Sequence, residues 1–86
     1  MVGGELKCNI LFFAAAAQAM DCRKQEITIA SGTTVGDAFD SLADSCEQLA
    51  ALSSICALAV DGQLAKRDTQ LHDDCTIAIL PPVSGG

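Results

Sequence analysis

The residues with the clearest capacity for chemistry are the last two of the chain, Gly85 and Gly86. Two glycines place a carboxylate on a backbone that can pass through a channel too narrow for a Cβ atom and can adopt positive φ angles. A carboxylate held in this way can be activated as a mixed anhydride with AMP, which releases pyrophosphate and leaves the acyl carbon open to a nucleophile. We therefore predict that Gly86 carries the reactive group and that Gly85 lets the tail thread into a partner.

The histidine and the cysteines form no second catalytic arrangement in the sequence. His72 lies in a polar loop without a second histidine or a placed nucleophile, so we predict a solvated side chain. The five cysteines include no C-x-x-C pair, which argues against a zinc site or a thioredoxin motif. Cys8, Cys46 and Cys75 fall on core-facing positions, where cysteine behaves as a small apolar residue. We expect Cys22 to be the most exposed.

The charge balance narrows the classes of partner. Eleven acidic residues against five Lys and Arg give a net charge of −6, which argues against nucleic acid and against an anionic membrane surface. A basic protein partner suits this charge better. We expect one acidic helix face to be solvated, with a partner contact as the alternative: Asp37, Asp40, Asp44 and Glu47.

The sequence also predicts where the protein resides. The uncharged run of residues 8–20 is too short and too polar to span a bilayer. With no signal-peptide pattern, we expect the cytoplasm, where thiols stay reduced. We predict neither a bound cofactor nor a metal site.

Alternation and turn signals predict five strands. Apolar side chains of one parity in residues 5–13 indicate the first strand. Asp61-Gly62 is a strong hairpin signal between the third and fourth strands. The strands are expected at residues 5–13, 23–30, 55–60, 63–65 and 75–80.

One main helix is predicted in the middle of the chain. A capping box at Thr34 and Asp37 opens an amphipathic helix of roughly three turns. Its apolar stripe is Val35, Phe39, Leu42, Cys46 and Leu49. Residues 14–20 are expected to be a short helical turn or a loop, and residues 47–53 a second short helical piece.

The order ββαβββ indicates one α+β domain. The economical arrangement is a ubiquitin-like β-grasp, in which a mixed sheet carries one main helix on one face and the last strand lies beside the first. Proline cannot donate to a sheet ladder, so Pro81 ends the last strand. We expect residues 1–80 to form the domain and residues 81–86 a flexible tail.

The ending Pro81-Pro82-Val83-Ser84-Gly85-Gly86, together with the strand before it, resembles the C-terminal signature of the molybdopterin synthase small subunits, sulfur carriers of the MoaD/ThiS superfamily. Residues 10–14 resemble that family's opening strand. Matching positions follow in order along nearly the whole chain: Thr34-Val35, Ala59-Val60, and Leu71 with Asp73. The thiamine-type sulfur carriers share the fold and the Gly-Gly, but are usually shorter and lack the Pro-Pro.

The resemblance implies a sulfur carrier that has no active site of its own. An ATP-dependent activating enzyme would adenylate Gly86, and sulfur from a persulfide would convert it to a thiocarboxylate. The chain would then dock on the large synthase subunit, in an assembly of two small and two large subunits, and deliver sulfur to cyclic pyranopterin monophosphate. That transfer builds the dithiolene of molybdopterin. ATP is used by the activating enzyme and is not bound as a cofactor.

The alternation of side chains predicts the docking surface. Phe13 and Leu80 point away from the core, and Leu64 lies where the family has another contact residue. We predict that these three residues bind the partner, together with the tail residues Pro81, Pro82, Val83 and Ser84. Two features depart from the family: residues 14–20 lack a basic residue often present after the first strand, and residues 72–75 lack a glycine in the turn.

Two other classes of function stay open at this point. A different carrier, or a protein modifier of the ubiquitin type, would form an isopeptide bond from Gly86 to a lysine. A cysteine-based redox or metal protein would require a thiol of low pKa or a bound metal ion.

Overall fold

The first strand, β1 (Glu5–Phe12), shows how alternation builds the core. In the computed structural model, which describes residues 4–82, Cys8, Ile10 and Phe12 are buried on one face of this strand. The intervening side chains point to the other face. The predicted strand is confirmed, and its end lies at Phe12, one residue earlier than expected.

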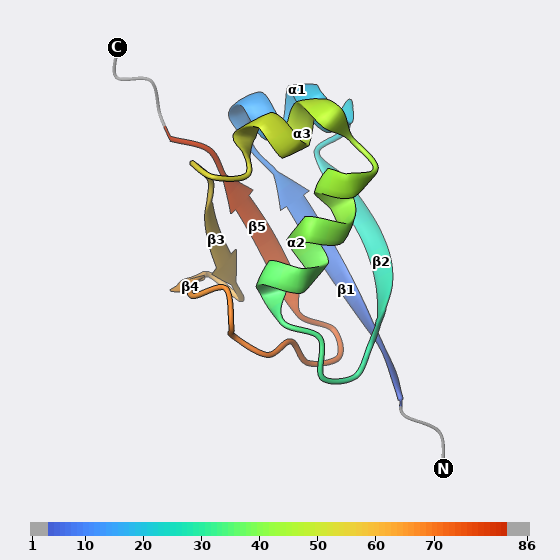
Figure 1. Cartoon of the computed structure of the whole chain (residues 1–86). Coiled ribbons are helices and arrows are strands. Elements are labelled where there is room, and N and C mark those ends of the chain that lie inside the picture. Colours follow the sequence, from blue (N-terminus) through green and yellow to red (C-terminus); the bar gives the residue numbers. More distant parts are fainter. Residues whose placement is uncertain (1–3, 83–86) are drawn as a thin grey trace.

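The strand β1 lies in a mixed sheet of five strands in the order β2-β1-β5-β3-β4 (Figure 1). β2 (Lys24–Ala30) pairs antiparallel with β1, and β5 (Thr76–Leu80) pairs parallel with it. β3 (Ala57–Val60) pairs antiparallel with β5 and with β4 (Gln63–Ala65). The last strand thus lies beside the first, as predicted, and the topology is the ubiquitin-like β-grasp.

The turn between β3 and β4 confirms the Asp-Gly hairpin signal. Asp61 and Gly62 have φ angles of 53° and 85°, as two-residue hairpin turns with positive φ at both positions require. The Asp61 carboxylate accepts a hydrogen bond from the Thr76 N–H at 2.9 Å, and the Asp61 N–H donates to the Thr76 carbonyl at 2.8 Å. The hairpin is therefore tied to the start of β5.

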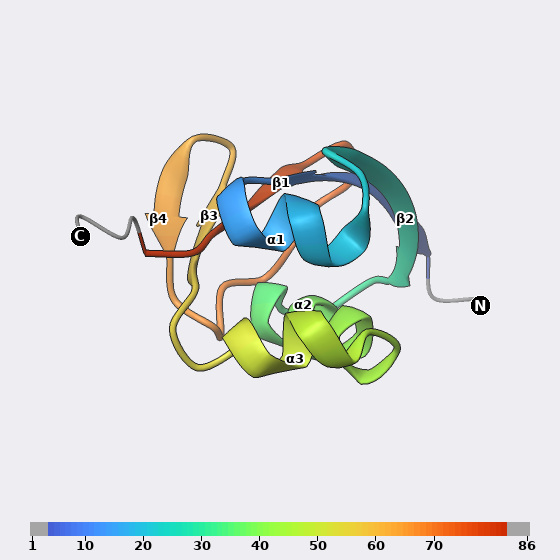
Figure 2. The same cartoon turned by 90° about the horizontal axis from the view of Figure 1, so that it is seen from above.

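The main helix, α2 (Val35–Asp44), covers one face of the sheet (Figures 1 and 2). The Thr34 hydroxyl accepts a hydrogen bond from the Asp37 N–H at 3.2 Å, which confirms the first half of the predicted capping box. The reciprocal bond from the Thr34 N–H to the Asp37 carboxylate is not among the hydrogen bonds of residues 4–82. The stripe that α2 buries contains Val35, Phe39 and Leu42.

The start of α2 packs closely against the loop between β4 and β5. The Gly36 N–H donates to the Arg67 carbonyl at 2.9 Å, and the Arg67 guanidinium donates to the Gly36 carbonyl at 3.3 Å. A Cβ atom at Gly36 would lie 2.8 Å from both the Cβ and the carbonyl oxygen of Arg67. The close approach of these two segments therefore depends on glycine at this position.

Two short helices complete the fold. Residues 14–20 form the helix α1 (Ala14–Met20), which ends at Asp21 with a φ of 56°. The helix α3 (Glu47–Leu52) is separate from α2. The second short helical piece predicted at residues 47–53 is thereby confirmed. The predicted stripe is wrong in placing Cys46 on the same helix as Val35: Cys46 precedes α3 in an extended conformation and is only half-buried against the core. The tight turn that ends α2, with the Cys46 N–H bonded to the Ala43 carbonyl, interrupts the stripe.

The core lies between the sheet and α2, with α1 and α3 at one end (Figure 2). Ile55, expected in the third strand, precedes it and is 55% exposed, because its N–H bonds to the Leu52 carbonyl in the turn after α3. Within residues 4–82, no helix has the length and apolar character needed to cross a membrane. The largest fully buried side chains are Phe39, Ile10, Leu49, Ile77, Ile79, Val35, Cys8 and Cys75.

Candidate functional site

The sheet face opposite α2 carries a group of apolar side chains near the end of β5. The strand register places Leu11, Ala78, Ala59 and Leu64 in one row across the sheet. Leu80 and Ala57 form the next row, and Phe13, which follows β1 with extended backbone, continues it on the β1 side. These seven residues are called the apolar band: Leu11, Phe13, Ala57, Ala59, Leu64, Ala78 and Leu80.

The band contains the three docking residues that the sequence analysis predicts within the domain. Phe13 is 45% exposed and Leu64 is 78% exposed, while Leu80 is half-buried. Pro81 is buried and Pro82 is exposed at the end of the described chain. The remaining predicted site residues lie outside the described residues: Val83, Ser84, Gly85 and Gly86. Their assignment stays a prediction, as does the binding role of the band.

The apolar character stops halfway along the same face. Toward the start of β1, Asn9 is paired with Thr76 on β5 and with Glu26 on β2. Lys7 is paired with Thr28 in the next row. The apolar side chains are thus confined to the end of the sheet at which β5 runs toward the C-terminus.

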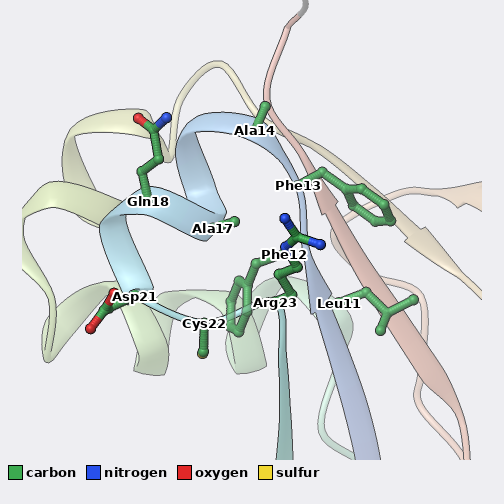
Figure 3. Close-up of a pocket in the computed structure, with 9 residues that line it drawn as sticks. All are labelled: Leu11, Phe12, Phe13, Ala14, Ala17, Gln18, Asp21, Cys22 and Arg23. Carbon is green, nitrogen blue, oxygen red and sulfur yellow. The ribbon is translucent and has the colours of Figure 1, made fainter.

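A hollow adjoins the band where β1 passes into α1. Its volume is about 840 Å³. Figure 3 shows the nine residues that line it, and two of them, Leu11 and Phe13, also belong to the band. The others are Phe12, Ala14, Ala17, Gln18, Asp21, Cys22 and Arg23. The band and the hollow therefore form one continuous surface.

Arg23 gives this surface a basic group that the sequence analysis did not assign. The Phe12 N–H donates to the Arg23 carbonyl at 2.9 Å, so the antiparallel pairing of β1 and β2 brings the arginine beside the end of β1. Figure 3 shows its side chain among the residues that line the hollow. Although residues 14–20 contain no basic side chain, the fold supplies one from the residue that precedes β2. If the antiparallel pairing of the first two predicted strands is continued by one residue, from Leu11–Lys24 to Phe12–Arg23, the position of Arg23 follows.

His72 lies at the other end of the sheet and has a structural partner. As predicted, its side chain is exposed, and its Nε2 pairs with the Asp61 carboxylate at 2.5 Å. This hydrogen bond raises the pKa of His72, and the contact of Nδ1 with the Asp73 carbonyl acts in the same direction. The pKa of Asp61 is lowered, first by the Thr76 N–H and then by His72. The pair ties the β3–β4 hairpin to the loop before β5.

The cysteines do not form a reactive centre. Cys8 and Cys75 are fully buried, as predicted, whereas Cys22 is half-buried like Cys46 and Cys56 instead of exposed. Burial raises the pKa of Cys8 to about 12 and also raises the pKa of Cys56. A nucleophilic thiol requires the opposite shift. Among residues 4–82, no group of His, Cys, Asp and Glu side chains could hold a metal ion.

The acidic helix face is exposed, as the sequence analysis predicts. One of its members, Asp40, pairs with the Arg67 guanidinium at 2.6 Å, and both side chains are about half exposed. A surface ion pair of this kind adds little to stability. It does fix the Arg67 side chain over the start of α2.

Comparison with known proteins places residues 10–86 in a family model described as the ThiS family. A curated relative from Mycobacterium tuberculosis, named molybdopterin synthase sulfur carrier subunit, is 32% identical over 82 residues. The match covers 94% of this chain and 99% of the relative. The match to this relative therefore spans almost the full length of both proteins.

Solved structures share the fold. The small archaeal modifier protein 1 of Haloferax volcanii matches with a TM-score of 0.78 at 22% identity, covering 91% of this chain and 99% of that one. A second match is a chain from the protein–protein complex of subunits 1 and 2 of the molybdopterin-converting factor from Helicobacter pylori. Its TM-score is 0.67 at 23% identity. That match covers 94% of this chain and 100% of the other.

Proposed function

The chain belongs to the ThiS family of sulfur carriers, and from this membership we propose that it is the sulfur-carrying small subunit of molybdopterin synthase. The relative from Mycobacterium tuberculosis that supports this choice carries that function in its name. The Pro81-Pro82 before the Gly-Gly ending supports it over a thiamine-type carrier, in line with the resemblance found in the sequence.

The observation that carries the proposal is the place of the apolar band. The band includes Leu80, the last residue of β5, and this strand leads directly into the segment that ends at Gly86. The band exposes Phe13, Ala57 and Leu64, and exposed apolar side chains grouped in this way often mark a protein interface. A partner that covers the band therefore receives the C-terminus at the same place, and docking and delivery of the carboxyl group are coupled.

The chemistry takes place on the carboxyl group of Gly86. An activating enzyme transfers AMP from ATP to this carboxylate and releases pyrophosphate. A persulfide sulfur attacks the acyl carbon, and AMP leaves. A second thiol then attacks the donor sulfur of the resulting acyl disulfide, forms a disulfide with it and releases the thiocarboxylate. The thiocarboxylate then gives its sulfur to cyclic pyranopterin monophosphate, and two such transfers complete the dithiolene.

The partners follow from this chemistry. The large synthase subunit holds the pterin and covers the band, with Phe13, Leu64 and Leu80 as contact residues and residues 81–86 entering its active site. The activating enzyme binds the same end of the chain. The net charge of −6 favours partner surfaces with basic residues around the apolar contact.

Intact-mass measurement tests the first step. The purified chain is incubated with ATP, a persulfide donor and the activating enzyme of its own cell. We expect a mass gain that corresponds to one oxygen replaced by one sulfur. A variant lacking Gly86 should stay unmodified while its thermal unfolding matches that of the full chain, because the removed residue follows the end of the last strand, β5, by six positions.

Three outcomes contradict the proposal. The intact chain gains no sulfur, the variant lacking Gly86 gains sulfur as readily as the intact chain, or the mass change marks an isopeptide bond between Gly86 and a lysine of another protein. The last outcome would assign the chain to the protein modifiers instead.

A further inference from the structure

Two buried thiols lie in contact between β1 and β5. The Cys75 thiol donates to the Cys8 sulfur at 2.9 Å, although the two residues are 67 positions apart in the chain. Both side chains are fully buried. Neither residue contributes to the band or to the hollow, so the proposed sulfur-carrier chemistry does not use them.

The strand pairing brings the backbone at the two thiols together. Asn9 and Thr76 form the first pair of the parallel ladder, and the Asn9 N–H donates to the Cys75 carbonyl at 3.0 Å, so Cys8 in β1 and Cys75 just before β5 flank the beginning of the ladder. Neighbouring strands lie about 4.8 Å apart, and a disulfide accepts Cα separations of roughly 4.4–6.8 Å. The sulfurs would have to approach by about 0.9 Å from their present 2.9 Å contact to reach the covalent distance.

From this juxtaposition we propose that Cys8 and Cys75 form a buried dithiol that a low-molecular-weight disulfide oxidises to an intramolecular cross-link between β1 and β5. One cysteine, as thiolate, attacks a sulfur of the reagent and expels one reagent thiol. The second cysteine attacks the protein sulfur of the mixed disulfide and expels the other. The two cysteines lose two protons and two electrons, and the reagent takes them up as two thiols.

Access to the pair is through the start of β5. The loop before this strand is held to β1 by the Lys7 N–H, which donates to the Asp73 carboxylate at 2.9 Å, and by the Asp74 N–H, which donates to the Lys7 carbonyl at 2.7 Å. These bonds lie at exposed positions, where local opening costs the least. Burial keeps the Cys8 thiol protonated in the closed fold, with its pKa raised to about 12. The exchange therefore proceeds from the opened segment or during folding.

The other three cysteines provide matched controls. Cys22, Cys46 and Cys56 are half-buried and free, and none of them makes a sulfur–sulfur contact among the hydrogen bonds of residues 4–82. Trypsin cleaves after Lys and Arg, so Cys8 and Cys22 fall in one peptide and Cys75 in another. The variant Cys22→Ala makes the mapping unambiguous.

Refolding in a glutathione redox buffer tests the proposal without depending on access to the folded core. The full chain and Cys22→Ala are unfolded, reduced, refolded in mixed reduced and oxidised glutathione, and then alkylated and digested. We expect loss of two free thiols and a single cross-link between the peptides of residues 8–23 and 68–86. Because the bond closes a long loop, the oxidised wild type should unfold about 10 °C or more above the reduced form.

The proposal fails if the refolded monomer keeps all five thiols free, if the cross-link maps to a different pair, or if the oxidised form is no more stable than the reduced one. Cys75→Ala should abolish the cross-link, and Cys56→Ala should keep it. The Cys22→Ala mapping and the unfolding temperatures decide the question even where a core variant does not fold. None of these results depends on the proposed function.

Discussion

The two ends of strand β5 differ: polar groups at its start are hydrogen-bonded within the fold, whereas apolar side chains at its end are partly exposed. At its start, Thr76 is bonded to Asp61 through backbone and carboxylate, and the preceding loop is bonded to Lys7. At its end, Leu80 lies in the apolar band beside the exposed Phe13. One end satisfies its hydrogen bonds within the fold, and the other leaves apolar side chains partly exposed.

Under the proposed function, stability and recognition are separated along one strand. The start of β5, the hairpin and the loop against α2 hold the domain together, while Phe13 and Leu64 of the band stay exposed. Substitutions in the two regions should therefore move different measurements. Changes in the band should alter binding and leave unfolding unchanged, and changes in the anchored region should do the reverse.

The largest effect is expected from Phe13→Asp in the band. A charge placed in a desolvated apolar contact should weaken binding to the large synthase subunit by about 100-fold, or ~3 kcal/mol. The fold should tolerate it, because Phe13 is the N-cap of α1 and aspartate is a favoured residue there. Isothermal titration measures the binding, and Ile55→Asp serves as control, since Ile55 is 55% exposed and lies outside the band. Equal losses in both variants would contradict the assignment.

Gly36→Ala should act in the opposite way. The new Cβ would lie 2.8 Å from two Arg67 atoms, one of them a backbone oxygen, so the loop must shift. We expect a loss of about 2 kcal/mol in the free energy of unfolding, measured by chemical denaturation, with unchanged binding to the large subunit. Gly4→Ala is the matched control, because a Cβ at Gly4 meets nothing within 4 Å. A neutral Gly36→Ala would show that the loop against α2 adapts freely.

Thr34→Ala should have a smaller effect on stability. It removes the oxygen that accepts the Asp37 N–H at the start of α2 and should cost about 1 kcal/mol. Ser31→Ala, an exposed change in the preceding turn, is the comparison. If both variants unfold at the same denaturant concentration as the wild type, the cap does not stabilise the helix.

The smallest effect should come from the His72–Asp61 pair, and it should depend on pH. The pKa of His72 is raised from 6.5, so its contribution is fully present below pH 6.5 and is lost as pH rises through the raised value. The pKa of Asp61 is lowered from 3.8, so its contribution is present above pH 3.8 and is lost as pH falls through the lowered value. His72→Gln should therefore be less stable than wild type between pH 3.8 and 6.5.

Thermal unfolding at a series of pH values measures this difference, which should shrink above the raised pKa of His72. A gap between the two proteins that stays constant from acid to alkaline pH would show that the ion pair contributes nothing.

Much of the fold could be predicted because local signals and packing agree. The alternation in β1, the Asp-Gly turn and the Thr34 cap each specify their own geometry, and the apolar stripe of α2 needs a sheet face. Apolar spacing alone does not mark where α2 ends, since Cys46 and Leu49 continue the period while the backbone turns at Ser45; the second short helical piece predicted at residues 47–53 is nevertheless found as α3.

The candidate site was predictable only where it follows from side-chain parity. Phe13 and Leu80 fall on the face opposite the core because alternation and strand order determine it. The place of Arg23 follows only from the register of the β1–β2 hairpin, and the pairing of His72 with Asp61 follows only from the path of the loop before β5, which no local pattern marks. The Cys8–Cys75 contact likewise appears only once β5 lies beside β1.

The most direct test of the central claim is a single-turnover transfer from the thiocarboxylated chain. The loaded chain is mixed with the large synthase subunit and cyclic pyranopterin monophosphate, and the intact mass of the chain and the pterin products are followed together. The account predicts that the chain returns to its carboxylate mass while sulfur appears in the pterin, and that Phe13→Asp slows both and Ile55→Asp neither. A chain that keeps its sulfur in this mixture, or loses it to water without any pterin product, would contradict the account.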